Sequence, residues 1–179
     1  MPKKKISKPK KKKVVKQKVQ KTIKQLSNSI TKLLDTANIK YKTLEHKVVF
    51  TAHDVSATTK KKLGEIAKVV LVKADKDFVL IVLPAGKYVD FNGIKKALKA
   101  KKVSMANEKD ITKYLKTKVG LLHPFGSEYN IKTLLDKNLS RAKKMIASAG
   151  TYTHSIELSL KDFEKITQPI KGVFSKAKR

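Results

Sequence analysis

The sequence contains no cysteine among its 179 residues. This absence excludes disulfides, thiol nucleophiles and cysteine-ligated zinc. Long hydrophobic runs are also absent: no window approaches about 18 uncharged apolar residues, so we expect no transmembrane helix and no membrane partner. The basic start, Met1–Lys5, is not followed by an apolar stretch, which argues against a secretory signal. Together these absences favour a cytoplasmic protein.

Motifs for metal binding, cofactor binding and covalent catalysis are missing as well. The four histidines, His46, His53, His123 and His154, do not show the close spacing that zinc sites use. The sequence has no Gly-x-Ser-x-Gly elbow of a serine hydrolase, no Walker loop and no dinucleotide-binding fingerprint. We therefore predict that the protein holds no metal ion and no cofactor.

Acidic residues are scarce: 14 of them face 43 lysines and arginines, which gives a net charge of +29. Residues 1–24 hold 12 of the lysines and no acid, so the rest of the chain is basic in its own right. Only two basic residues are arginine, the side chain best suited to reading bases. This pattern predicts salt-sensitive binding to the backbone of a polyanion. A general surplus of surface lysine is the alternative explanation.

The chain divides into a tail and one domain. Residues 1–15 are a lysine-rich, low-complexity segment, which we predict to be a disordered arm. Apolar residues at helical spacing then predict an amphipathic helix over 16–36. We assign residues 16–175 to one mixed α/β domain with a mostly antiparallel sheet of six or seven strands and helices packed around it.

Within this domain the pattern of apolar residues predicts short strands and helices. We expect strands over 39–44, 68–74, 77–83, 131–135, 145–149 and 154–158, with 48–50 extending or pairing with the first. We expect helices over 54–66, with Asp54 as its N-cap, over 91–101, over 107–116 and from residue 159 or 160 onward. Residues 68–83 form a predicted hairpin around the Asp75-Lys76 turn.

One lysine stands out because it lies in an apolar run, Ile66–Val72. A lysine in such a run is costly unless its ammonium finds partners or points into a cleft, so Lys68 is a candidate site residue. The alternative is that its side chain reaches solvent from the edge of a sheet.

The segment Gly120–Gly126 is a second candidate. Glycine allows a positive φ and proline fixes the backbone, so such a loop can aim N–H groups at an ester carbonyl or its oxyanion. An ordinary connection between strands explains the same residues. Asp136, at a strand end, could position a ligand amine or cap a turn, and His154, which begins a strand, could be catalytic or structural.

Several segments then carry a resemblance, by their joint order and spacing rather than by any single motif. They are Leu44-Glu45-His46 with Phe50-Thr51-Ala52, Glu65–Leu71 with Lys68, Val82-Leu83-Pro84-Ala85, Gly120–Pro124 with Phe125-Gly126, Leu135-Asp136, and Ala149-Gly150 with His154-Ser155-Ile156. In this order they resemble the YbaK/prolyl-tRNA deacylase family of aminoacyl-tRNA editing domains, over roughly residues 25–172.

The resemblance implies that the protein hydrolyses the ester between a wrong amino acid and the 3′ end of a tRNA. It implies that Lys68 places the substrate near the terminal phosphate and ribose, that Gly120 holds the carbonyl through its backbone, and that His154 affects activity and specificity. The remaining residues that we assign to substrate binding are His46, Leu121, Leu122, His123, Pro124 and Asp136. No general base is required from the protein, since a ribose hydroxyl near the ester can help to activate water.

We therefore expect a free-standing deacylase that acts in trans on mischarged tRNA, with an aminoacyl-tRNA synthetase as a further candidate partner. The loop interior Leu121–His123 is bulkier than in many members of the family, and it either narrows the amino-acid pocket or points outward. The lysine-rich extension lies outside the family domain, and we expect it to add nonspecific affinity for tRNA. The alternative function is that of a noncatalytic RNA-binding protein built on the editing fold.

Overall fold

The computed structural model describes residues 29–177 of the chain. Residues 29–36 are helical, which agrees with the end of the helix predicted over 16–36. The predicted arm of residues 1–15 and the first part of that helix lie outside the described residues.

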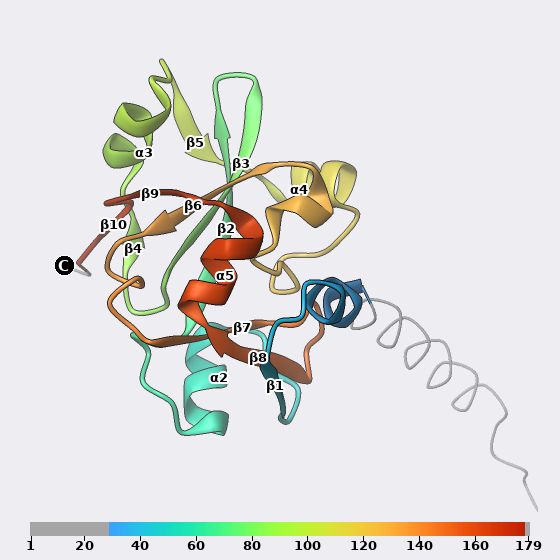
Figure 1. The fold of residues 1–179 in the computed structure, drawn as a ribbon. Coiled ribbons are helices and arrows are strands. Elements are labelled where there is room, and N and C mark those ends of the chain that lie inside the picture. Colours follow the sequence, from blue (N-terminus) through green and yellow to red (C-terminus); the bar gives the residue numbers. More distant parts are fainter. Residues whose placement is uncertain (1–28, 178–179) are drawn as a thin grey trace, which may run out of the picture.

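The elements then follow one another as short strands and short helices (Figure 1). The strands are β1 (Tyr41–Glu45), β2 (Ala67–Ala74), β3 (Asp77–Pro84), β4 (Tyr88–Val89), β5 (Val103–Met105), β6 (Lys132–Asp136), β7 (Lys144–Ser148), β8 (His154–Ser159), β9 (Ile170–Gly172) and β10 (Ser175–Lys176). The helices are α2 (Ala52–Thr59), α3 (Phe91–Leu98), α4 (Glu108–Leu115), the 3-10 helix η1 (Gly126–Tyr129) and α5 (Leu160–Thr167).

The strands of residues 29–177 form three sheets instead of the single sheet that the sequence predicted. The largest has the order β5-β2-β3-β6-β9, the second has the order β1-β8-β7, and β4 pairs with β10. Most strand pairings in the described part of the chain are antiparallel, and among them only β3–β6 and β6–β9 are parallel. The mixed, mostly antiparallel α/β class is therefore confirmed. The predicted number of six or seven strands is too low, because β4, β5, β9 and β10 have only two or three residues each and show no period.

The β2–β3 hairpin agrees closely with its prediction. Ala67 lies opposite Pro84 and Ala74 lies opposite Asp77, so the turn is formed by Asp75 and Lys76. Asp75 has a φ of 54° and its carboxylate accepts hydrogen bonds from two backbone amides, which holds the turn in a conformation that L-residues seldom adopt.

Helix α2 differs from its prediction at both ends. It begins after Thr51, whose hydroxyl accepts a bond from the amide of Asp54 while the Asp54 carboxylate accepts one from the amide of Thr51. Asp54 is therefore the third helical residue of a capping box and not the N-cap. The helix ends at Thr59 because Lys60 adopts a left-handed conformation with a φ of 55°. Lys99 and Lys116 end α3 and α4 in the same conformation.

The main core cluster connects the two larger sheets to residues 29–36 and α5. Residues 29–36 and α5 contribute Leu34 and Phe163 to the same buried cluster as Phe125. Phe125 is fully buried, with its ring centroid 5.8 Å from that of Phe163. Since burying a phenylalanine contributes about 2–3 kcal/mol, Phe125 anchors the loop that precedes η1. Figure 1 shows α2 and α3 at opposite ends of the molecule. Among residues 29–177, no helix combines the length and the hydrophobicity needed to cross a bilayer.

Candidate active site

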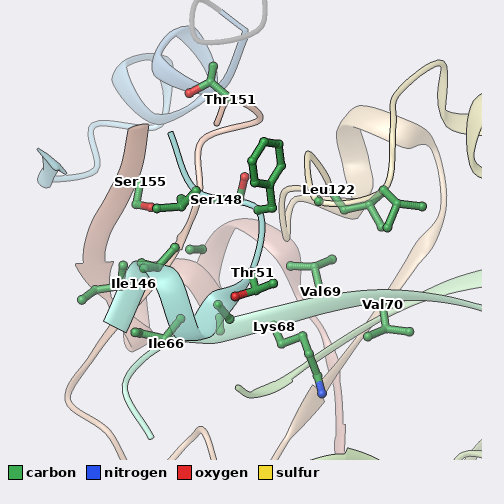
Figure 2. Close-up of a pocket in the computed structure, with 18 of the residues that line it drawn as sticks. Thr51, Ile66, Lys68, Val69, Val70, Leu122, Ile146, Ser148, Thr151 and Ser155 are labelled. Atoms are coloured by element: carbon green, nitrogen blue, oxygen red, sulfur yellow. The ribbon is translucent and has the colours of Figure 1, made fainter. Parts of the chain in front are cut away.

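A cavity of about 340 Å³ opens beside strand β2, a volume typical of small-molecule sites (Figure 2). Its walls come from β2, from the segment that leads into α2, from the loop before η1, and from β7 and β8. These elements lie far apart in the sequence. The parallel bridge between Ile66 and Ile146 joins the two larger sheets and holds two of the walls together.

Most of the cavity wall is apolar, and the polar groups are few. The apolar part includes Ile66, Val69, Leu71, Ile111, Leu122 and Ile146. The polar side chains are those of His46, Thr51, Lys68, Ser148, Thr151 and Ser155. Within residues 29–177 the lining includes no carboxylate, so a ligand ammonium in this cavity would depend on hydroxyl and carbonyl oxygens.

Lys68 lies at the edge of this cavity and is half-buried. Its Nζ donates a hydrogen bond to the carbonyl oxygen of Lys87 at 2.7 Å and lies 6.0 Å from the centre of the Tyr88 ring. The ammonium therefore has the partners that the apolar run required. In Figure 2 the side chain of Lys68 points away from Thr151, and these two residues lie on opposite sides of the lining.

The glycine of the loop has the conformation that the sequence analysis anticipated. Gly120 has a φ of +86°, which is unfavourable for L-residues with a side chain. A Cβ at this position would lie 3.4 Å from the carbonyl oxygen of Phe50 and 3.7 Å from the Tyr152 ring. Gly120 and Leu122 line the cavity, whereas Leu121 and Pro124 are not among its lining residues.

His123 is buried in the protein and is not part of the cavity wall. Its ring stacks on that of Tyr129, with centroids 4.3 Å apart and planes 16° apart. Among the buried side-chain atoms of residues 29–177, Nδ1 of His123 has no hydrogen-bond partner. Burial lowers the pKa of His123 to about 4 and raises the pKa of Tyr129. His123 is therefore a neutral ring that packs the loop against Tyr129, and it does not reach the cavity.

The histidine that lines the cavity is His46, and His154 is not among the lining residues. Nδ1 of His46 lies 2.9 Å from the carbonyl oxygen of Lys47, which can only accept, so Nδ1 carries the proton in the neutral ring. Nε2 lies 3.0 Å from the hydroxyl of Ser155 and accepts its hydrogen bond. Nδ1 of His154 is 2.9 Å from the hydroxyl of Thr153. Because successive residues of a strand point to opposite faces, Ser155 faces the cavity and His154 does not.

The structure does not bring Asp136 to the cavity. Its side chain is completely buried, and its two oxygens accept hydrogen bonds from the amides of Asn138 at 2.8 Å and Phe174 at 2.6 Å. Of the two explanations for Asp136, the geometry favours the structural one, because the carboxylate caps the turn after β6 and ties down the C-terminal segment.

Sequence reasoning missed the hydroxyl groups at the cavity: Thr51, Ser148, Thr151 and Ser155. Thr51 lies about a hundred residues before the other three, which fall within residues 148–155, and no sequence motif connects the two regions. It also missed Phe50 as an exposed lining residue, although Phe50 belongs to a segment that carried the resemblance. No group of three or more potential metal ligands occurs among residues 29–177.

Comparison with known proteins identifies the family to which this chain belongs. A family model described as the aminoacyl-tRNA editing domain matches residues 46–166. The chain therefore belongs to the aminoacyl-tRNA editing domain family. This result confirms the resemblance found in the sequence and the expectation of an editing enzyme, a deacylase of aminoacyl-tRNA.

Similar proteins agree with this membership. The prolyl-tRNA editing protein ProX of Acetoanaerobium sticklandii is 26% identical over 141 residues, which cover 75% of this chain and 86% of that protein. A crystal structure of a hypothetical protein has a TM-score of 0.77 at 19% identity and covers 82% of this chain and 99% of its own. A structure described as a trans-editing enzyme for prolyl tRNA synthetase has a TM-score of 0.76 at 16% identity. The match covers 85% of this chain and 98% of the chain in that structure. These two structures support the fold.

Proposed function

We propose that the protein hydrolyses the ester of a mischarged tRNA in the cavity beside β2. We also propose that this tRNA is one that prolyl-tRNA synthetase aminoacylates. The observation that supports the site is the combination of a mostly apolar cavity with a glycine at positive φ and a half-buried lysine at its edges. The name of the relative from A. sticklandii supports the choice of tRNA. Because the substrate is tRNA, we propose the cytoplasm as the place of action.

In this proposal the amino-acid side chain occupies the apolar part of the cavity. A volume of about 340 Å³ accommodates one amino-acid residue and excludes the body of the tRNA. The ammonium of the aminoacyl group is held by hydroxyl oxygens such as those of Ser148 and Ser155, since the lining within residues 29–177 includes no carboxylate. His46 orients the Ser155 hydroxyl by accepting its proton in a hydrogen bond.

The proposed reaction needs no covalent intermediate. The oxygen of a water molecule attacks the ester carbonyl carbon, the bond to the ribose oxygen breaks, and that oxygen takes up a proton, which releases the amino acid and the tRNA. An aminoacyl ester is already activated, so holding the carbonyl against the Gly120 backbone supplies the main requirement, stabilisation of the oxyanion. Lys68 exchanges its bond to Lys87 for a phosphate oxygen of the tRNA 3′ end.

The test is single-turnover deacylation on a panel of mischarged tRNAs with variants of Lys68 and Gly120. Lys68→Ala should lower kcat/KM about 10- to 100-fold, as expected for one charge-assisted hydrogen bond. Lys73→Ala is the matched control, because Lys73 lies on the same strand but is exposed and away from the cavity. Gly120→Ala should reduce turnover at least about tenfold through the displaced backbone. Its control is Gly64→Ala, since a Cβ at Gly64 meets nothing within 4 Å.

Equal rates for the site variants and their controls would exclude this cavity as the catalytic site. The net charge of +29 favours a second candidate function, that of a noncatalytic RNA-binding protein. Binding of every tRNA in the panel without hydrolysis of any of them would support that second function. Hydrolysis that requires added prolyl-tRNA synthetase would identify the synthetase as a partner.

A further inference from the structure

The rim of the cavity exposes an unusual amount of apolar surface. Phe50 lines the cavity and still has 67% of its surface exposed, the largest fraction for a large hydrophobic residue among residues 29–177. Met105 and Val119 also line the cavity and are 53% and 51% exposed. A single exposed apolar residue needs no explanation, but three at one cavity mouth indicate a surface that contacts a ligand.

The Phe50 ring packs against one neighbouring ring, and the backbone that carries it is fixed by hydrogen bonds. Its centroid lies 5.1 Å from that of Tyr152, with the ring planes tilted by 54°. The amide of Phe50 donates to the carboxylate of Asp54 at 3.3 Å, and the amide of the buried Val49 donates to the carbonyl of Tyr152 at 2.9 Å. Because the backbone at residues 49 and 50 is hydrogen-bonded and the ring packs on Tyr152, less conformational freedom is left to lose when a ligand binds to the ring.

The cavity and the rim together define what such a ligand must look like. If the aminoacyl group enters the cavity, the ribose that carries it lies at the mouth and the terminal base lies beside the rim. Aromatic side chains stack on the bases of single-stranded nucleic acids without regard to sequence. The exposed lysines Lys47 and Lys118 neighbour the rim residues in the chain and supply charges for the preceding phosphates.

We propose that Phe50, supported by Tyr152, is the platform on which the 3′-terminal base of the tRNA stacks, and that this contact positions the ester in the cavity. The inference rests on the proposed function, since it takes the 3′ end of a tRNA as the ligand. A second copy of this chain is a poorer occupant of the rim, because both copies would carry a charge of +29 and repel each other.

The first test measures stacking without any hydrolysis. The chain contains no tryptophan, so Phe50→Trp introduces a single indole at the rim. Titration of this variant with the uncharged trinucleotide CCA should quench its fluorescence in a saturable way. The same trinucleotide with an abasic terminal nucleotide should not quench it. The control is Tyr114→Trp, at a residue that is 52% exposed on α4 and does not line the cavity. Absence of quenching at residue 50, or equal quenching at both positions, overturns the proposal.

The second test measures the contribution to hydrolysis. Phe50→Leu, which keeps an apolar side chain but removes the aromatic face, should lower kcat/KM about 5- to 100-fold, mainly through KM, and Phe50→Tyr should retain it. On a substrate with an abasic terminal nucleotide, Phe50→Leu and the wild type should react equally fast. An equal penalty on both substrates refutes stacking. Quenching by CCA with no hydrolysis of any tRNA would refute the proposed function and leave the platform intact. A wild-type dimer that Phe50→Leu converts to monomer would assign the rim to self-association.

Discussion

The buried His123 makes the stability of the protein depend on pH in a way that one substitution should remove. Desolvation lowers its pKa from 6.5 to about 4 in the folded protein, whereas in the unfolded chain the ring returns to its ordinary value. Between these two values the unfolded state binds more protons than the folded state. His123 therefore does not reduce the free energy of unfolding above pH 6.5. As the pH falls from 6.5 towards 4, proton binding to the unfolded state lowers this free energy, and below pH 4 His123 lowers it no further.

The size of the effect follows from the same two values. Each pH unit is worth about 1.4 kcal/mol, so the whole interval corresponds to roughly 3 kcal/mol of unfolding free energy, taken as an order of magnitude. His123→Phe keeps a ring that can stack on Tyr129 and removes both the titration and the unpartnered Nδ1. We expect the variant to be at least as stable as the wild type at pH 4.5 and to lose less stability between pH 7 and pH 4.5.

The measurement is urea unfolding at half-unit steps of pH for the wild type and His123→Phe, followed by circular dichroism. Other groups also titrate in this range, so the quantity of interest is the difference between the two proteins at each pH. His53→Gln, at an exposed histidine of α2, controls for the loss of one imidazole. If the difference between wild type and His123→Phe stays constant from pH 7 to pH 4.5, the ring is not held neutral by burial and the reasoning is wrong.

Two further substitutions test structural assignments. Asp136→Asn should lower the unfolding free energy by about 1–3 kcal/mol, because an amide nitrogen replaces one of two buried acceptors, and it should leave KM for tRNA unchanged; a raised KM in folded protein would restore Asp136 to the substrate site. Gly126→Ala should destabilise the protein by about 1–3 kcal/mol in thermal unfolding, because its Cβ would collide with the Thr133 hydroxyl and the Ile131 carbonyl. Gly64→Ala, which has open space, is the control, and equal stability of the two variants would contradict this assignment.

Much of the fold could be predicted because the strongest signals are local. The β2–β3 hairpin was placed to within one residue at each strand end, since two apolar runs flank a short polar turn. The short strands could not be predicted: β4 and β10 have two residues each, and they form only because the chain brings residue 88 against residue 176. Their pairing is a property of the tertiary structure and leaves no period in the sequence.

The site was predictable in its parts and less so in its arrangement. The candidate residues Lys68, Gly120, Leu122 and His46 all reach the cavity lining. Lys68 was found from its place in an apolar run and Gly120 from the glycine and proline of its loop, whereas Leu122 and His46 were found through the resemblance. Which of the residues 154 and 155 faces the cavity depends on the register of β8, and a shift of one residue reverses it. The pattern of residues in β8 does not show which of its two faces lines a cavity.

The lysines that end the helices connect the stability of the fold to its charge. Lys60, Lys99 and Lys116 occupy the left-handed positions at which glycine is the usual residue, and all three are exposed. Each places a cation at the negative end of a helix dipole, which is favourable, in a backbone conformation that costs about 1–2 kcal/mol. At these three helix ends the favourable interaction of the lysine charge with the helix dipole therefore comes with an unfavourable backbone conformation. Because dissolved salt screens both interactions, rising ionic strength should weaken these helix ends and the predicted attraction to polyanions together.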